Sequence, residues 1–140
     1  MEVAVTVRNC VELYNSAVAG VKFNNTETII AIAQMIHAVR PVAESYEAQR
    51  KDMLEKYGKL DPDTGELVVK DRDVQFKSPA DRKQFEGDHK KLLETAATVV
   101  VPKLDNGKIG GEGLTPITLL VLIPFGLSLE AQTPQPAPVP

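Results

Sequence analysis

The chain has 140 residues, enough for one domain with a modest hydrophobic core. Its hydrophobic fraction of 43% and its charged fraction of 25% are those of a globular protein and exclude a disordered one. The net charge of −3 comes from interspersed acids and bases, so we expect no nucleic-acid partner. The single cysteine, Cys10, excludes an internal disulfide and fits a reducing cytoplasm, and no signal sequence is recognisable at the start of the chain.

The first part of the chain predicts a strand followed by a short helix. Valines alternate with smaller or polar residues over positions 3–7, which is typical of a strand. Thr6 can cap a helix that covers about residues 7–19. Residues 21–23 are predicted as a brief extended link.

A long amphipathic helix is predicted from about Asn24 to Tyr57. Asn24 and Glu27 have the spacing of a capping box, and Gly58 should end the helix. Pro41 lies inside the run and removes a backbone amide, so we expect a kink there. Apolar residues recur at alternating steps of three and four, which places one apolar seam along the helix. The seam consists of Ile29, Ile32, Ile36, Val39, Ala43, Tyr46, Met53 and Tyr57, with Arg50 as its only polar member.

The middle of the chain predicts a turn, a hairpin and a second helix. Residues 61–65 read DPDTG, which is turn chemistry. Residues 66–69 and 74–76 are predicted as the two strands of a hairpin. A cap followed by proline predicts a helix from Ser78 to about Glu94. Its inward positions are Phe85, His89, Leu92 and Leu93.

The last third combines a strand, a glycine-rich loop, an apolar helix and a tail. The β-branched residues 99–101 predict a strand, and the loop 105–113 leads to the uncharged segment 114–129. This segment is shorter than the roughly 20 residues of a membrane span and holds two prolines, so we expect no membrane partner. Residues 131–140 alternate proline with small residues and predict a polyproline-like tail. One domain is therefore expected over residues 1–130.

Known catalytic, metal and cofactor motifs are not matched. The turn at 61–65 has acids spaced as in a calcium loop, but its glycine comes one place early and position twelve is Arg72. The glycine-rich loop lacks the spacing of nucleotide-binding loops, which leaves an anion held by backbone amides as the open alternative. Neither His37 nor His89 has a metal-ligating neighbour along its helix, and Cys10 is expected to be buried. We therefore expect no catalytic residues, no metal, no cofactor and no enzymatic activity.

The partner interface is predicted in the apolar segment and the tail. Packing in the core is the simpler use of so many large apolar side chains, but any part that stays exposed marks an oligomer or partner surface. The residues assigned to this interface are Ile117, Leu120, Phe125, Leu127, Pro134, Pro136 and Pro138.

Several short motifs follow one another along the predicted elements in a characteristic order. They are Leu13-Tyr14-Asn15 in the first helix, Glu55-Lys56-Tyr57-Gly58 at the end of the long one, Gly65-Glu66 after the turn, Phe85 in the charged helix, and Leu114-Thr115-Pro116 at the last helix. Over roughly residues 8–125 this layout resembles a family of small proteins of unknown function encoded by tailed bacteriophages. The apolar end of the chain departs from the usual pattern of that family. The resemblance implies a phage origin and brings no catalytic residues.

Together these observations predict an α+β fold. A kinked long helix and a shorter one should pack with a small antiparallel sheet formed by the hairpin and the strand at Val99, with or without the N-terminal valines. We expect a non-enzymatic phage protein that acts through protein–protein contacts and self-association, in the virion or during its assembly. Its partner would be a phage structural protein or a host protein, in the host cytoplasm or the virion. The alternative is an anti-defence protein that inhibits a host immune protein or sequesters its nucleotide signal.

Overall fold

The computed structural model describes residues 1–15, 21–105 and 109–127. It has the expected α+β class. The elements in chain order are β1 (Glu2–Thr6), α1 (Val7–Tyr14), β2 (Lys22–Phe23), α2 (Thr26–Tyr57), β3 (Val69–Lys70), β4 (Asp73–Val74), α3 (Pro79–Glu94), β5 (Ala96–Val100), β6 (Gly111–Glu112), α4 (Pro116–Leu122) and the 3-10 helix η3 (Ile123–Phe125).

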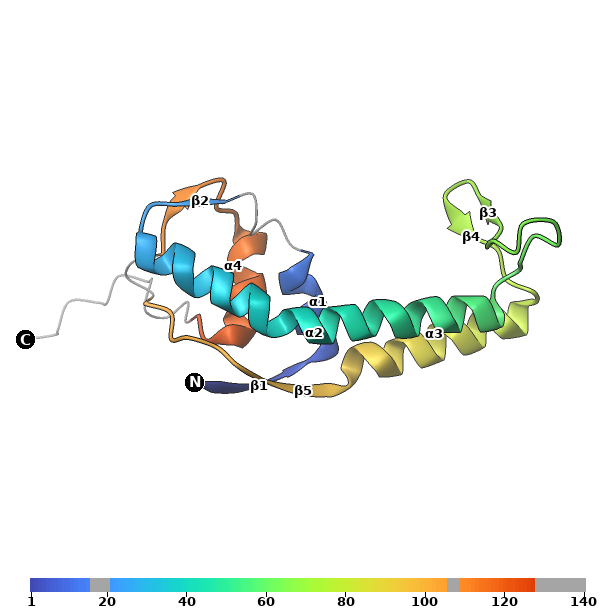
Figure 1. The fold of residues 1–140 in the computed structure, drawn as a ribbon, viewed down its shortest axis with the longest axis horizontal. Helices are drawn as coiled ribbons and strands as arrows, with labels where there is room; N and C mark the ends of the chain where they lie inside the picture. The colour runs from blue at the N-terminus through green and yellow to red at the C-terminus, as the bar shows by residue number, and fades with distance from the viewer. Residues whose placement is uncertain (16–20, 106–108, 128–140) are drawn as a thin grey trace, which may run out of the picture.

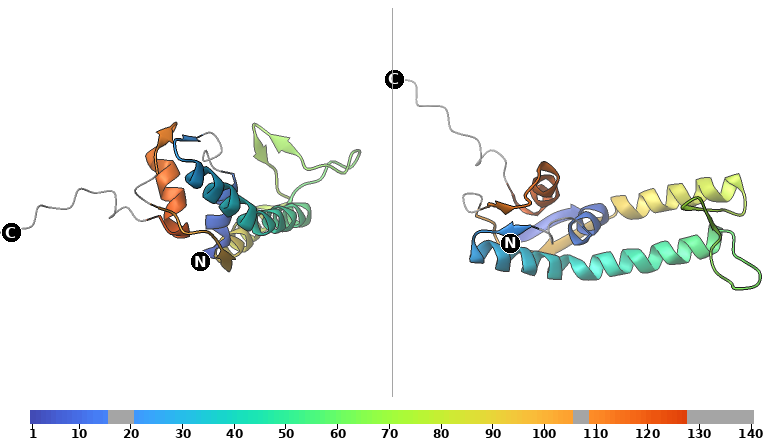
Figure 2. Two further views of the ribbon diagram at one scale, coloured as in Figure 1. Left: turned by 60° about the vertical axis from the view of Figure 1, so that its left-hand side comes forward. Right: turned by 90° about the horizontal axis from the view of Figure 1, so that it is seen from above.

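Two regions make up the molecule (Figure 1). The lobe comprises the described residues of 1–40 and 95–127, and it packs α1, the start of α2 and α4 around the paired strands β1 and β5. The arm comprises residues 41–94. Figure 2 shows from above that the second half of α2 and α3 run alongside one another, with the β3–β4 hairpin at the far end of the arm.

The helix α2 continues without a break for 32 residues. Its N-cap is Asn25, whose side chain accepts a hydrogen bond from the Thr28 N–H at 3.2 Å. The expected cap, Asn24, lies one residue too early, and its N–H bonds the Gly110 carbonyl at 2.9 Å instead. The helix passes through Pro41, and Figure 1 shows its axis bending between the first and second halves. This bend agrees with the kink expected from the missing amide.

The buried side of α2 is shifted from the predicted seam. Ile36 and Met53 were expected to be buried but are half-buried. Their neighbours Met35 and Leu54 are buried instead. Ile29 is 47% exposed. A helix of 3.6 residues per turn drifts away from a regular alternation of three and four, so the face that meets the lobe and the face that meets α3 differ. Five seam residues are buried as predicted: Ile32, Val39, Ala43, Tyr46 and Tyr57.

The other helices begin where their caps predict, and two of them have proline at the first position. The described part of α1 ends at Tyr14, and the rest of the helix predicted to residue 19 lies outside the described residues, apart from Asn15 at its C-cap. Each cap is a hydroxyl that accepts a hydrogen bond from an amide in the first turn: Thr6 from Asn9, Ser78 from Asp81, and Thr115 from Thr118.

The strands form three separate two-stranded antiparallel sheets. The N-terminal valines join the strand at Val99 through the β1–β5 pair, as allowed by the sequence. The expectation that the hairpin shares this sheet is wrong, because β3 and β4 pair only with each other. The 16-residue helix α3 stands between hairpin and β5, a distance of about 24 Å at 1.5 Å per residue.

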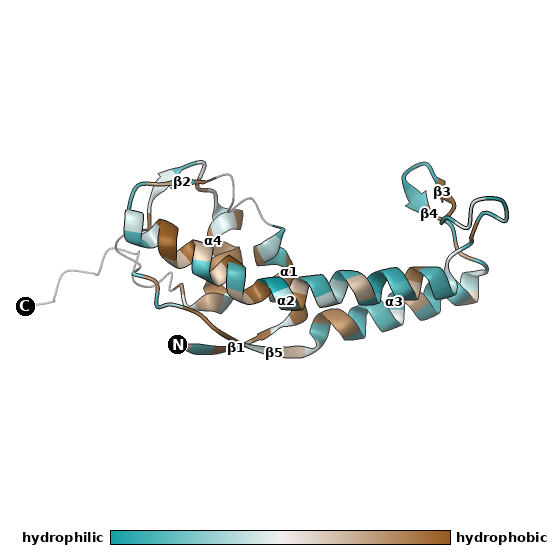
Figure 3. Cartoon of the chain, in the orientation of Figure 1, coloured by the Kyte–Doolittle hydropathy of each residue, from teal (hydrophilic) through white to brown (hydrophobic). Residues whose placement is uncertain are grey.

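The hydrophobic core lies in the lobe. Figure 3 shows the hydrophobic residues gathered there, while most of the arm is hydrophilic. The helix α3 has no fully buried residue. The largest fully buried side chains of the described chain are Phe125, Leu13, Met35, Leu122, Val39 and Val101.

Candidate interaction surfaces

The helix α4 presents two of the predicted interface residues to solvent. Thr115 caps the helix and fixes its start, so that Thr118 and Leu122 fall on the inward face and are buried. Ile117 and Leu120 lie on the other face, 70% and 59% exposed. This outward pair is the part of the predicted interface that the described residues leave accessible.

The structure corrects two other members of that interface. Phe125 is fully buried and Leu127 is 3% exposed, so both belong to the core and neither is available to a partner in this fold. The chain turns back after η3 because Gly126 takes a φ of +109°, and the Leu127 N–H then bonds the Leu122 carbonyl at 3.3 Å. The remaining members lie outside the described residues: Pro134, Pro136 and Pro138.

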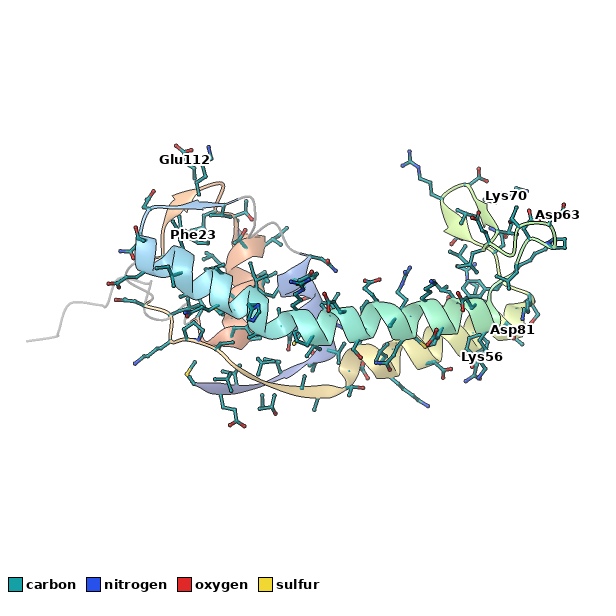
Figure 4. The ribbon with its side chains drawn as sticks, in the orientation of Figure 1. Phe23, Lys56, Asp63, Lys70, Asp81 and Glu112 are labelled. Atoms are coloured by element: carbon teal, nitrogen blue, oxygen red, sulfur yellow. The ribbon has the colours of Figure 1, made fainter. Side chains whose placement is uncertain are left out.

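A second apolar surface lies at the start of α2. Ile29 and Ile30 are 47% and 53% exposed, and Ile29 borders an open groove of about 360 Å³ between β2 and α2. Figure 4 shows Phe23 lying between β2 and α2, whereas Glu112 of the neighbouring strand points away from the lobe. The predicted place of Ile29 in the buried seam of the helix is wrong, because its side chain borders this groove. The groove is lined by Val21, Lys22, Phe23, Ile29, Ile32, Ala33 and Ile36.

Polar contacts hold α3 against α2 in the arm. The Tyr46 hydroxyl and His89 Nε2 lie 2.6 Å apart, and the Tyr57 hydroxyl donates to Asp88 Oδ2 at 2.8 Å. Phe85 stacks on the His89 ring, with centroids 5.4 Å apart and planes 8° from parallel. The sequence pattern predicts that Tyr46 and His89 lie on the inward faces of their helices, but it does not predict their contact, because they are 43 positions apart.

Burial and nearby cations set the charge state of this junction. Burial lowers the pKa of His89, and the positive charges of Arg50 and Arg8 lower it further. Burial also raises the pKa of the Tyr46 hydroxyl. A neutral imidazole can therefore accept the hydrogen bond of a neutral phenol. The polar atoms of the two side chains are directed at each other, which is an arrangement that positions helices.

The other candidates from the sequence are Cys10, a possible metal site and the loop 105–113. Cys10 is fully buried, as predicted, and burial raises the pKa of its thiol. In the described parts of the chain no three His, Cys, Asp or Glu residues are placed to hold a metal ion. Of the loop 105–113, residues 106–108 lie outside the description. Gly111 pairs with β2, and a Cβ there would collide with the Lys22 backbone.

Comparison of the chain with protein-family models, with curated proteins and with solved structures finds no match. Among the residues that the structure describes, no helix is both long enough and apolar enough to cross a membrane. What the protein does is therefore inferred from the surfaces of its described residues.

Proposed function

We propose that this protein acts through protein–protein contacts and self-association, without catalysing a reaction. The observation that carries the proposal is the exposure of four large aliphatic side chains on the lobe, Ile117 and Leu120 on α4 and Ile29 and Ile30 on α2. Removing apolar surface from water is favourable by about 25 cal/mol per Å². A partner that covers either pair removes these side chains from water, as happens at an interaction site.

The setting that we propose is a bacteriophage particle or its assembly. Its support is the order of short motifs along residues 8–125, from the first helix to the Thr115-Pro116 start of α4. The partner would be a further copy of this chain, a phage structural protein or a host protein. Mass spectrometry of purified particles tests this setting, because an assembly component should be found bound to them or to their precursors.

Self-association is tested by light scattering of the full chain over a range of micromolar concentrations. The unsubstituted protein should form oligomers, and the double variant Ile117→Ser with Leu120→Ser should remain a monomer. The matched control replaces Leu60 and Val69, which are 38% and 59% exposed at the tip of the arm. Serine at these two positions should leave association unchanged. Because all four positions are exposed, neither double variant should change the free energy of unfolding by more than about 0.5 kcal/mol per residue.

Two results would count against the proposal. A monomer at every concentration, together with absence from phage particles and their precursors, would remove its basis. Equal loss of association in the α4 variant and in the arm-tip control would show that the lobe surface is not the one that matters.

A further inference from the structure

Two stretches of the sequence are free of charge for longer than any other. They are residues 28–39, in the first half of α2, and residues 113–129, whose described part includes α4 and η3. Charged residues make up 25% of the chain, so both runs depart from its usual composition. The central, fully buried part of a protein–protein interface is depleted of charge in the same way.

Each run carries an apolar surface outside the core, and the two surfaces differ in shape. The first borders the open groove of about 360 Å³ between β2 and α2, called here the α2 groove, where Lys22 is the only charged residue of the lining. The second is the outward pair on α4, Ile117 and Leu120, which project one helical turn apart into solvent. Pockets of about 300–1,000 Å³ hold small ligands, so the groove has room for two aliphatic side chains.

The outward pair of one molecule cannot enter the α2 groove of the same molecule. The helix α1 packs against both α2 and α4. Figure 2 shows from above that α1 and β1 lie between these two helices. Thr118 and Leu122 face the core, so the opposite face of α4, with the outward pair, points away from α1 and from α2. The two surfaces can therefore meet only between molecules.

We propose that the outward pair on α4 of one copy docks in the α2 groove of a second copy. The contact rests on the self-association proposed above and identifies the surface that receives α4. Its support is the match in charge and shape. Among the α-helices that the structure describes, α4 alone has no charged residue, so it can enter a groove with an apolar lining without burying a charge.

This contact joins two different surfaces and is therefore heterologous. Every copy has one groove and one outward pair, so each added copy leaves a free surface at either end of the assembly. Heterologous contacts produce rings where the rotation closes and filaments where it does not. The mass of the unsubstituted oligomer should therefore exceed that of two chains as the concentration rises. Pairing of α4 with α4 would instead stop at a dimer.

A charge placed in the groove tests the contact. Ala33 is exposed and lines the groove, whereas its exposed neighbour Gln34 does not. Ala33→Arg puts a guanidinium beside Lys22 with no acid in the lining, and it should raise the concentration needed for association at least about tenfold. Gln34→Arg adds the same charge one position further along the helix and is the matched control. It should associate like the unsubstituted chain. Ile29→Ser is a second groove variant and should act in the same direction as Ala33→Arg.

Mixing two variants separates the proposed contact from other modes of association. The double variant Ile117→Ser with Leu120→Ser keeps an intact groove, and Ala33→Arg keeps an intact outward pair. Each should be a monomer alone, and an equimolar mixture should form a dimer of twice the 15.3 kDa chain mass that grows no further. Formation of this dimer also shows that both variants are folded. Light scattering of the full chains measures all three samples.

The outcomes distinguish this contact from self-association in general. If the α4 variant is monomeric but Ala33→Arg and Ile29→Ser associate like the unsubstituted chain, self-association through α4 stands and the groove is not its receptor. A mixture that remains monomeric would also overturn the contact. An unsubstituted chain that is monomeric at every concentration would remove both this contact and the self-association on which it rests.

Discussion

The lobe and the arm are stabilised in different ways. The lobe buries Phe125, Leu122 and Val101 almost completely, so its stability comes from apolar packing. In the arm, α3 buries no side chain fully and is held by two tyrosine hydrogen bonds and half-buried aromatic rings. Segments with few buried apolar contacts open at lower free energy than the core. The difference indicates that apolar packing stabilises the lobe, whereas within the arm a small number of specific contacts hold α3 against α2.

The largest expected effect on stability is that of Phe125→Ala in the lobe, and Phe85→Ala in the arm is its comparison. Phe125→Ala should lower the free energy of unfolding by about 3–5 kcal/mol, because it leaves a cavity in a closed core. Phe85→Ala should cost about 1–2 kcal/mol, because that ring is half-buried and solvent can fill its place. Urea denaturation of both variants measures the difference. Equal losses would mean that the arm is packed as tightly as the lobe.

The next effect is confined to the arm. Tyr57→Phe removes the hydroxyl that donates to Asp88 and should cost about 1 kcal/mol. Hydrogen exchange of α3 amides should become faster, while amides of the β1–β5 pair should not change. Tyr14→Phe is the matched control, since Tyr14 is 38% exposed on the lobe and none of the described residues bonds its hydroxyl. Faster exchange throughout the lobe would show that the two regions open together.

The Tyr46–His89 contact predicts a dependence on pH. The pKa of His89 is lowered in the folded protein, so the unfolded chain takes up its proton first as the pH falls. The free energy of unfolding should therefore decrease as the pH falls below about 6.5, the ordinary pKa of histidine, until folded His89 is protonated as well. Urea denaturation between pH 7.5 and about pH 5.5 checks this slope.

Substituting each of the two histidines in turn tests whether His89 causes this pH dependence. His89→Gln should flatten the pH dependence, whereas His37→Gln, at an exposed position on α2, should preserve it. An unchanged slope in His89→Gln would assign the pH dependence to other groups and would remove His89 from the contacts that stabilise the arm.

Most of the secondary structure could be predicted from local signals, but the pairing of elements could not. The caps Ser78 and Thr115 and the end of α2 at Gly58 each depend on a few neighbouring residues, and each was found where expected. The burial of Phe125 depends on how η3 folds back on the lobe, which no local pattern contains. The same holds for the contact between Tyr46 and His89. Of the predicted interface, Ile117 and Leu120 on α4 are exposed, whereas Phe125 and Leu127 are buried, because composition alone does not show which apolar residues the fold turns inward.

The smallest expected effect lies at the tip of the arm, in the turn between β3 and β4. Asp71 and Arg72 both have positive φ, 54° and 65°, as the two central residues of a type I′ hairpin turn require. Arg72→Gly relieves the unfavourable conformation and should stabilise the hairpin by about 0.5–1 kcal/mol. Gly65→Ala, at a φ of +71° in the preceding turn, should have the opposite sign. Amide exchange at Gln75, whose N–H donates to the Val68 carbonyl at 2.9 Å across the hairpin, measures both. Because the hairpin lies at the far end of the arm, neither change should move the urea midpoint of the lobe. A shift there would show that the arm and the lobe unfold as one cooperative unit.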